Sequence, residues 1–404
     1  MSGLSMTGLL SSLGALSFAI WVYLVFFRGD FWRADQRLPR GLREPAVWPE
    51  VVAVVPARNE AAVVGEAIRS LLVQDYPGKF SIILVDDGSS DATAGCARAS
   101  AAALGKEGLL TVIGSGALPK GWVGKVWAME QGRLLEAKTA AKGAGYFLFT
   151  DADIAHAPDN VSALVAKAET GALDLVSLMV RLKAETFWER LLLPAFVFFF
   201  QMLYPFSWVN DPIKPMAAAA GGCMLVRRAA LDRLDGLGAI RNELIDDCAL
   251  ARAIKANGPI WLGLTLETHS IRAYGGLSGV WHMVARTAYT ELRHSPARLA
   301  GVLAGMTVTY LLPPTFVLLY GLHENAGAGA FGLAAWVLMA AAYRPSLRLY
   351  GEAAWTGFLL PFVALLYCGM TFDSARRHWH KRGGEWKGRT QGEPAKEEPG
   401  VGQG

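Results

Sequence analysis

Two carboxylates one residue apart, Asp151 and Asp153, follow an apolar run at residues 146–150 that has the composition of a buried β-strand. Both acids therefore come at the carboxyl end of that predicted strand. Ligands bind at this end of the strands in open α/β sheets, and carboxylate oxygens suit Mg²⁺ or Mn²⁺. The spacing indicates a metal site for a diphosphate. Taken alone, this short spacing is more often an acidic strand-end loop that merely caps the next helix.

Polar residues also follow the first predicted strand of the chain. Residues 51–55 are rich in valine and end at Pro56. Arg58 and Glu60 come next, at the opening of a predicted helix, where polar side chains can reach the base and ribose of a nucleotide. A plain solvated helix start is the structural alternative.

Asp86 and Asp87 end the second predicted strand, residues 81–85. One of these acids can accept a hydrogen bond from a uracil imide or a ribose hydroxyl, while the other fixes the turn that Gly88 permits. Turn chemistry alone is the alternative. Lys125 opens a later predicted helix, where it either brings a cation to the diphosphate or is only a surface charge.

Strands and helices alternate through this part of the chain. A third strand is predicted at residues 109–113, a glycine- and proline-rich loop at residues 114–124, and a helix at residues 125–138. Such alternation predicts the α/β class, with a mostly parallel sheet covered by helices on both faces. The polar motifs then meet at one edge of the sheet.

Four motifs in this order resemble the signatures of family 2 glycosyltransferases. They are Val55-Pro56-Ala57-Arg58-Asn59-Glu60, Val85-Asp86-Asp87-Gly88-Ser89-Ser90-Asp91-Ala92-Thr93, Gly124-Lys125 with Gly132 downstream, and Asp151-Ala152-Asp153. The resemblance covers roughly residues 50–295 and implies the GT-A fold with a nucleotide-sugar donor, usually a UDP-sugar. The whole chain is similar to the hopene-associated glycosyltransferases, a bacterial subgroup linked to hopanoid lipids.

The resemblance also implies roles for these residues. A divalent ion, Mg²⁺ or Mn²⁺, is implied at Asp151 and Asp153. The donor-binding residues that it implies are Pro56, Arg58, Glu60, Asp86, Asp87, Lys125 and Asp151.

Further motifs resemble the acceptor side of the same family. Gly221-Gly222-Cys223 is similar to its glycine-rich strand beneath the acceptor, where absent side chains let a substrate approach the backbone. Residues 242–252 resemble its Glu-Asp motif, with Asp246 in place of the glutamate and Asp247 at the position of the catalytic base. Helix capping by Asp246 is the alternative.

Arg286 lies where processive membrane synthases carry a Gln-x-x-Arg-Trp motif. Residues 283–287 read Met-Val-Ala-Arg-Thr, so only the arginine is kept. This difference argues against a processive polysaccharide synthase and leaves the role of Arg286, predicted on the acceptor side, open.

The composition predicts membrane segments at both ends. Of 404 residues, 52% are hydrophobic and 18% are charged, which fits a soluble unit flanked by apolar helices. Residues 8–27 have the length of a membrane anchor, and no lysine or arginine precedes them, unlike in a secretory signal. The arginines that follow place the next domain in the cytosol by the positive-inside rule.

Three apolar runs near the carboxyl terminus, residues 299–322, 326–343 and 353–372, are further candidates. If all three cross, the basic tail falls outside, against the positive-inside rule. We therefore expect one of them to be re-entrant or interfacial, and Pro313-Pro314 points to the first.

The aromatic-rich run at residues 186–206 is predicted to be an interfacial helix that leads a lipid acceptor to the site. A buried core helix is nearly as well supported by the same residues. The basic clusters that flank the apolar ends suit an anionic lipid surface rather than nucleic acid. Four cysteines without CxxC spacing indicate a reduced domain with neither zinc nor disulfides.

The expected organisation therefore has five parts. They are an N-terminal transmembrane anchor (1–28), a basic linker (29–50), a cytosolic GT-A domain (51–295) with a donor half (51–155) and an acceptor half (156–295), C-terminal membrane segments (296–373), and a basic, then disordered tail (374–404).

The sequence, with its resemblance, thus predicts a multi-pass protein of the bacterial inner membrane. It would be an inverting glycosyltransferase that moves a sugar from a nucleotide-sugar to a lipid acceptor in hopanoid biosynthesis. One alternative is transfer to a polyprenyl phosphate. Another, of a different class, is a non-catalytic lipid-binding or scaffold protein that keeps a vestigial nucleotide site.

Overall fold

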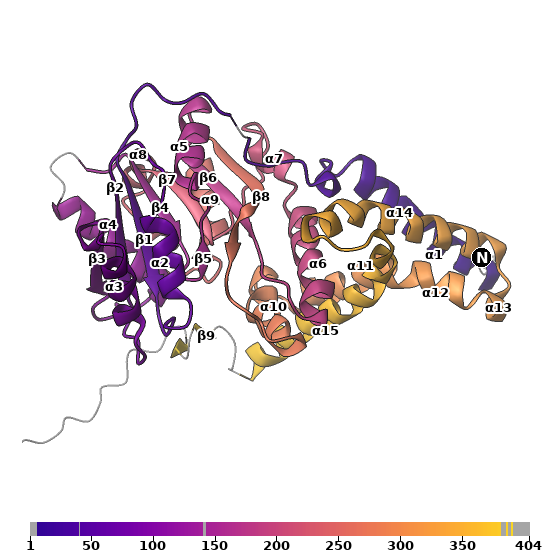
Figure 1. The fold of residues 1–404 in the computed structure, drawn as a ribbon. Helices are drawn as coiled ribbons and strands as arrows, with labels where there is room; N and C mark the ends of the chain where they lie inside the picture. Colours follow the sequence, from indigo (N-terminus) through magenta and orange to yellow (C-terminus); the bar gives the residue numbers. More distant parts are fainter. Residues whose placement is uncertain (1–5, 40, 140–142, 381–384, 387–388, 391–404) are drawn as a thin grey trace, which may run out of the picture. The chain divides into compact units, whose positions relative to one another are not determined.

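The computed structural model describes residues 6–39, 41–139, 143–380, 385–386 and 389–390. The chain divides into two compact units, and most of their helices and strands are labelled in Figure 1. The first, here called the helical unit, draws on residues 1–36, 183–211 and 273–383. The second, the sheet unit, draws on residues 37–182, 212–272 and 384–404.

The sheet unit is built on one eight-stranded sheet with the order β3-β2-β1-β4-β7-β6-β8-β5. Pairs β1–β2, β1–β4, β2–β3 and β6–β8 are parallel, and pairs β4–β7, β6–β7 and β5–β8 are antiparallel. The strands are β1 (Val51–Ala57), β2 (Phe80–Asp86), β3 (Leu110–Gly114), β4 (Tyr146–Thr150), β5 (Ile154–Ala155), β6 (Leu175–Arg181), β7 (Cys223–Arg227) and β8 (Ile260–Ser270). A separate two-stranded sheet pairs β9 (Glu385–Trp386) with β10 (Arg389–Thr390).

Helices cover both faces of this sheet, as predicted. Alternate β1 residues such as Ala53 and Val55 share one core with Ile68 of α2, Ala97 of α3 and Leu164 of α5. On the other face α4 packs against β1 and β2. The helices of the unit are α2 (Val64–Leu72), α3 (Thr93–Ala103), α4 (Gly124–Thr139), α5 (Asn160–Thr170), α8 (Arg228–Arg233) and α9 (Asp246–Lys255), with short 3₁₀ turns η2 (Glu107–Leu109) and η3 (Gly238–Ile240).

The approach of α4 to the sheet depends on Gly132. A Cβ at this position would lie 2.4 Å from Cγ1 of Val54, because the helix backbone rests directly on β1. We expect Gly132→Ala to lower the free energy of unfolding of the sheet unit by about 1–3 kcal/mol, the typical effect of overpacking a core. Thermal unfolding of the purified protein measures it.

Gly95→Ala is the matched control for this prediction. Gly95 also lies within a helix, α3, but a Cβ there meets no atom within 4 Å. The control should gain up to about 1 kcal/mol from helix propensity. Equal melting temperatures for the two variants would contradict the predicted close packing of α4 on β1.

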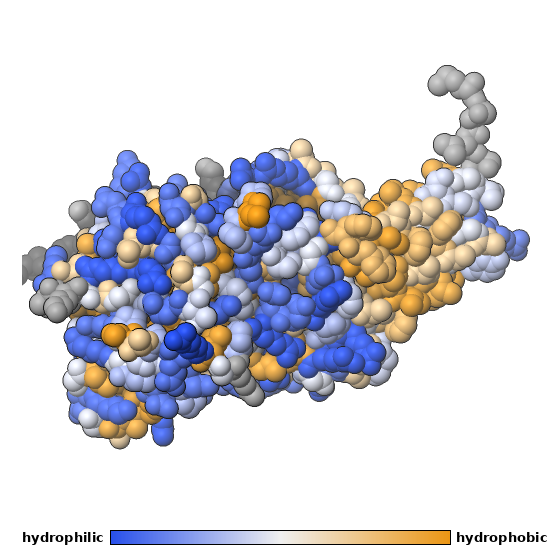
Figure 2. Space-filling view, turned by 90° about the horizontal axis from the view of Figure 1, so that it is seen from above, coloured by the Kyte–Doolittle hydropathy of each residue, from blue (hydrophilic) through white to orange (hydrophobic). Residues whose placement is uncertain are grey.

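Among its described residues, the helical unit holds four helices that are long and apolar enough to cross a membrane, by length and composition: Met6–Phe26, Pro296–Leu318, Ala326–Tyr350 and Ala354–Trp379. Figure 2 shows that the surface of this unit is largely hydrophobic on the face in view. Its elements are α1 (Met6–Phe26), η1 (Phe31–Arg33), α6 (Phe187–Leu203), α7 (Phe206–Asn210), α10 (Leu277–Glu291), α11 (Pro296–Met306), a π-helical turn (Thr307–Leu311), α12 (Leu312–Leu318), α13 (Tyr320–His323), α14 (Ala326–Tyr350), η5 (Ala354–Leu359) and α15 (Leu360–Trp379).

The proline pair lies within one continuous helical run, Pro296–Leu318, and whether this run crosses the membrane or is re-entrant stays a prediction. Pro313 lacks the N–H that would bond the carbonyl of Thr309, and the helix passes through a π-helical turn at this point. The Trp21 indole of α1 donates to that carbonyl at 2.8 Å, and the Ser17 hydroxyl donates to the carbonyl of Val308 at 2.6 Å. Helix α1 is therefore an integral part of the helical unit.

Helix α6 is a core helix, which corrects the preferred interfacial assignment. Leu192, Phe198 and Gln201 are buried, and the helix packs against α10 and α14. Its start is fixed by a capping box between Thr186 and Glu189, whose carboxylate also accepts backbone hydrogen bonds from Tyr274 and Gly276. Apolar composition alone could not distinguish burial by protein from burial by lipid.

The compact units also differ from the expected domain boundaries. Residues 183–211 and 273–295, expected within the catalytic domain, belong to the helical unit because α6 and α10 pack against the apolar helices α14 and α15. Most of the predicted tail after residue 380 lies outside the described residues.

Candidate active site

The predicted site residues of the donor half meet at the carboxyl ends of β1, β2 and β4. These strands are parallel, with Ala57 paired to Asp86 and Val54 to Phe149. Asp86 ends β2, and Asp151 follows β4 directly. Pro56 is buried within β1, so it shapes the strand rather than presenting a ligand group.

The two acids after β2 have different environments. Asp87 is fully buried, and its Oδ1 accepts a 2.7 Å hydrogen bond from the Ser115 hydroxyl. Arg58 donates to the carbonyl oxygens of Asp87 and Gly88, so it supports the same turn. Asp86 is only partly buried, and its Oδ1 accepts from the backbone N–H of Ser89. Asp87 therefore builds the turn, and Asp86 is the acid that can meet a ligand.

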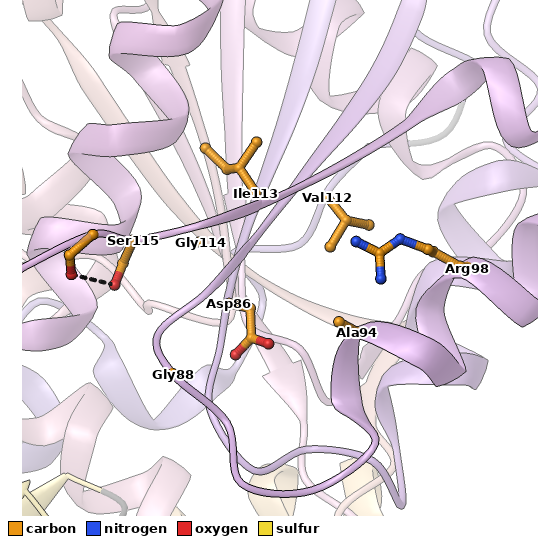
Figure 3. Close-up of a pocket in the computed structure, with 9 residues that line it drawn as sticks. Asp86, Gly88, Ala94, Arg98, Val112, Ile113, Gly114 and Ser115 are labelled. Atoms are coloured by element: carbon orange, nitrogen blue, oxygen red, sulfur yellow. Dashed lines mark hydrogen bonds between the residues drawn. The ribbon is translucent and has the colours of Figure 1, made fainter. Parts of the chain in front are cut away.

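A pocket lies beside Asp86, between the ends of β2 and β3 and the start of α3. Its volume is about 300 Å³, and Val112 and Ser115 contribute to its lining. Figure 3 shows the Asp86 carboxylate at the end of β2 and the Arg98 side chain extending from α3 toward Val112. The pocket thus offers an anion, a cation and an apolar wall to a small polar ring. No sequence motif pointed to Arg98, which lies beyond the strand-end motif that closes at Thr93.

Lys125, the second residue of α4, lies among three carboxylates. Its Nζ is 2.9 Å from Asp151 Oδ1 and 3.4 Å from Asp246 Oδ2. Burial alone lowers the pKa of Lys125, but Asp151, Asp246 and Asp247 together outweigh burial, so the net pKa lies above its ordinary value. Lys125 is therefore a permanent cation that holds the acids of both predicted halves of the site together.

Asp247 is held by two backbone N–H groups. Gly221 donates to its Oδ2 at 2.8 Å, and Cys248 donates to its Oδ1 at 2.7 Å. Burial, and next the charge of Asp246, raise the pKa of Asp247 to about 6, against the opposing effect of Lys125. A carboxyl with this pKa is ionised at neutral pH and is a better proton acceptor than an ordinary aspartate.

Asp246 does not cap α9, which corrects that alternative. The helix begins at Asp246 itself, its N-cap residue is Ile245, and no side chain caps it. Asp246 Oδ2 is buried without a hydrogen-bond partner, 3.4 Å from the Lys125 ammonium. Its contact is therefore electrostatic, and its charge acts on Lys125 and Asp247.

The glycine motif contributes backbone to this cluster. A Cβ on Gly221 would lie 3.2 Å from Lys125 Nζ and 3.3 Å from Asp247 Oδ2, so the absent side chain leaves room for both. The carbonyl of Gly222 accepts a hydrogen bond from Thr150 at 2.8 Å. Cys223 is buried in β7, and burial raises its pKa to about 12, so it is a core residue and no ligand contact.

Asp153 is paired with an arginine that lies outside every sequence motif. Arg272, two residues beyond β8, donates from Nε to Asp153 Oδ2 at 2.6 Å, and its Nη2 reaches Glu60 at 2.6 Å. Glu60 is therefore engaged by Arg272 in this structure. Burial, and next Asp151, raise the pKa of Asp153 above its ordinary value, although Arg272 opposes them.

Two carboxylates at this edge suit a metal ion that is shared with a ligand. Among the described residues, no group of three or more histidine, cysteine, aspartate or glutamate side chains could hold an ion by itself. Mg²⁺ is commonly held by one or two carboxylates together with substrate phosphates. Asp151 and Asp153 fit that arrangement and do not form a closed, all-protein site.

Arg286 lies on α10 in the helical unit, and its side chain is exposed. The other predicted site residues belong to the sheet unit. Its proposed acceptor role therefore stays a prediction.

The fold is of the GT-A type. A mannosyltransferase from Pyrobaculum calidifontis, solved in complex with GDP-Man and Mn²⁺, has a similar fold, with a TM-score of 0.52, 18% identity, and coverage of 92% of this chain and 99% of its own. The sequence model of Glycosyl transferase family 2 matches residues 52–235. This part of the chain is therefore a family 2 glycosyltransferase domain.

Two curated relatives share part of the sequence. A dodecaprenyl-phosphate galacturonate synthase from Rhizobium johnstonii is 35% identical over 141 residues, which cover 34% of this chain and 38% of the relative. An N-acetylglucosaminyltransferase from Rhizobium leguminosarum bv. viciae is 37% identical over 126 residues, or 31% of this chain and 27% of the relative. The chain thus spans well under half the length of either relative.

Proposed function

We propose that the protein is a membrane-bound glycosyltransferase that moves a sugar from a nucleotide-sugar to a lipid acceptor, with inversion at the anomeric carbon. The observation that carries this proposal is the cluster of Asp151, Asp246 and Asp247 around Lys125, on the same sheet whose β2 and β3 ends form the pocket at Asp86. Four helices long and apolar enough to cross a membrane support the lipid acceptor. The bacterial inner membrane, with the sheet unit in the cytosol, is the proposed location.

The donor's nucleoside would occupy the pocket at Asp86. Its volume of about 300 Å³ suits a base rather than a whole donor. Asp86 can accept a hydrogen bond from the imide of uracil, and Arg98 can donate to a uracil carbonyl. A UDP-sugar is therefore the proposed donor, with its diphosphate directed toward Asp151 and Lys125.

A divalent ion, Mg²⁺ or Mn²⁺, would be held by Asp151 and Asp153. When bound, such an ion supplies positive charge that stabilises the departing diphosphate. We expect EDTA to abolish transfer and Asp153→Asn to weaken donor binding roughly tenfold or more in the presence of metal, measured by titration calorimetry. Nucleotide affinity and activity that are indifferent to EDTA would contradict the metal assignment.

Asp247 would be the general base. As the acceptor oxygen bonds to the anomeric carbon, its proton passes to Asp247, and the bond between that carbon and the diphosphate oxygen breaks with its electron pair. The two N–H groups from Gly221 and Cys248 keep the carboxylate in place. Direct displacement of this kind inverts the anomeric configuration.

The raised pKa of Asp247 predicts a pH profile. The base must be ionised, so kcat/KM should fall about tenfold per pH unit below about pH 6 and level off above it. The folded protein also holds this proton more tightly than the unfolded chain, so Asp247 favours the folded state less as pH rises through that range. The measurement is the pH profile of kcat/KM in Asp247→Asn, which should no longer fall at acidic pH. A fall like that of the wild type would mean that another group titrates.

Two classes of lipid acceptor differ in how strongly transfer to them should depend on Asp247. A hydroxyl acceptor, as on a hopanoid, must lose a proton in the reaction and so depends on Asp247. A polyprenyl phosphate, suggested by the name of one relative, is largely ionised at neutral pH because its second pKa is about 6. Transfer to the phosphate should therefore survive Asp247→Asn far better than transfer to the hydroxyl.

The proposal is tested with full-length protein in lipid nanodiscs and a panel of radiolabelled UDP- and GDP-sugars. Total bacterial membrane lipid and a pure polyprenyl phosphate serve as separate acceptors. Radiolabel in the lipid phase is the expected result. The non-catalytic alternative predicts nucleotide binding with neither donor hydrolysis nor transfer.

A further inference from the structure

Arg272 connects two of the predicted site loops within the sheet unit. Its guanidinium donates from Nε to Asp153 Oδ2 at 2.6 Å, and from Nη2 to both carboxylate oxygens of Glu60 at 2.7 and 2.6 Å. Asp153 follows β4, whereas Glu60 follows β1. One cation thus bridges carboxylates that are 93 positions apart in the sequence.

The backbone holds Arg272 in this position. Ile271 donates to the Asp153 carbonyl at 2.9 Å, and Ser270 pairs with Ile154 in the antiparallel pair of β5 and β8. The backbone of Arg272 therefore follows a segment that is hydrogen-bonded to Asp153 and its neighbour, which keeps the guanidinium close to that carboxylate. Asp153 and Glu60 are both largely shielded from solvent, which strengthens the two ion pairs.

The contact with Asp153 conflicts with metal binding at the same carboxylate. The guanidinium uses Oδ2 of Asp153, and a divalent ion bound to that oxygen would face a positive charge at hydrogen-bond distance. A metal ion can therefore use Asp153 fully only after Arg272 has withdrawn. The guanidinium is also bound to Glu60, so Arg272 stays within the site when it withdraws from Asp153.

A diphosphate can serve both cations, as a ligand of the metal ion and as a new partner of Arg272. It brings negative charge to the metal and to the arginine at once, and the planar guanidinium suits two phosphate oxygens better than a single carboxylate oxygen. We propose that Arg272 is a positioning residue that occupies the metal side of Asp153 until a nucleoside diphosphate donor arrives, and thereby makes metal binding depend on donor binding. The inference rests on the proposed function, since it presumes a diphosphate donor.

Mn²⁺ binding to the full-length protein in detergent tests this proposal, with unbound Mn²⁺ measured by electron paramagnetic resonance. The wild type should bind Mn²⁺ weakly by itself and at least about tenfold more tightly with UDP or GDP. In Arg272→Met, which keeps the length but not the charge, affinity for Mn²⁺ alone should rise about tenfold and the gain from nucleotide should shrink. Arg69→Met, at an exposed arginine of α2, should behave as the wild type.

Arg272→Lys is the second variant. It keeps the positive charge and so serves as the test if Arg272→Met fails to fold. A lysine cannot bridge both carboxylates with a planar fork, so the coupling between Mn²⁺ and nucleotide should fall to an intermediate value. Mn²⁺ affinity without nucleotide that equals the wild type in both variants overturns the proposal. So does a wild type that binds Mn²⁺ equally with and without nucleotide. Donor turnover by the same preparation shows separately whether the proposed function stands.

Discussion

Asp247→Asn is expected to lower the turnover of transfer to a hydroxyl acceptor by roughly a hundredfold or more, the typical contribution of a positioned general base. The asparagine keeps the shape of the side chain, but its amide cannot take the acceptor's proton. Donor affinity should change little, because the donor's proposed contacts are Asp86, Lys125 and Asp151. Steady-state kinetics should therefore show a fall in kcat with little change in KM for the donor.

Asp246→Asn is the matched control, one residue away. It removes a negative charge that raises the pKa of Asp247, but leaves the proposed base in place. Turnover should stay within about tenfold of the wild type, and the acidic limb of the pH profile should move to lower pH. Equal losses in the two variants would contradict the assignment of Asp247 as the base.

Lys125→Met is expected to have the largest effect on stability. It leaves Asp151, Asp246 and Asp247 without the ammonium that lies among them. Removing one partner of a buried ion pair typically costs about 3–5 kcal/mol, because the remaining charge is left uncompensated. We expect the melting temperature to fall on the order of 10 °C and nucleotide-sugar binding to be lost.

The pH dependence of this loss identifies its cause. Uncompensated carboxylates take up protons more readily, so their mutual repulsion falls as the pH is lowered. The difference in melting temperature from the wild type should therefore be smaller at about pH 5 than at about pH 8. Lys120→Met, at an exposed lysine of the loop before α4, should leave the melting temperature unchanged. A loss that is independent of pH would indicate a packing defect instead.

The sequence predicted the carboxyl edge of the sheet well, because its signals are local. Asp86 and Asp151 each follow a run of strand-forming residues, and parallel strands bring their carboxyl ends to one edge. The expected helices on both faces followed from the alternation of strands and helices. The antiparallel insertion of β7 between β4 and β6 carries no such local signal, since pairing order depends on the whole chain.

The contacts that could not be predicted from the sequence are mainly those between residues far apart in the chain. Arg272 and Arg98 belong to no motif, and each reaches the site from an element whose position is set by tertiary structure. The sequence likewise suggested that Asp246 caps a helix, because an aspartate at a helix start usually does so. In the structure the same charge lies against Lys125 instead.

The anomeric configuration of the product tests direct displacement at this site most directly. The protein is incubated with an α-linked nucleotide-sugar and a lipid acceptor, and the anomeric configuration of the new glycosidic bond is determined by NMR. Single displacement with Asp247 as the base predicts a β-linked product. An α-linked product would require two displacements or a different attacking group, and would contradict the proposed role of Asp247.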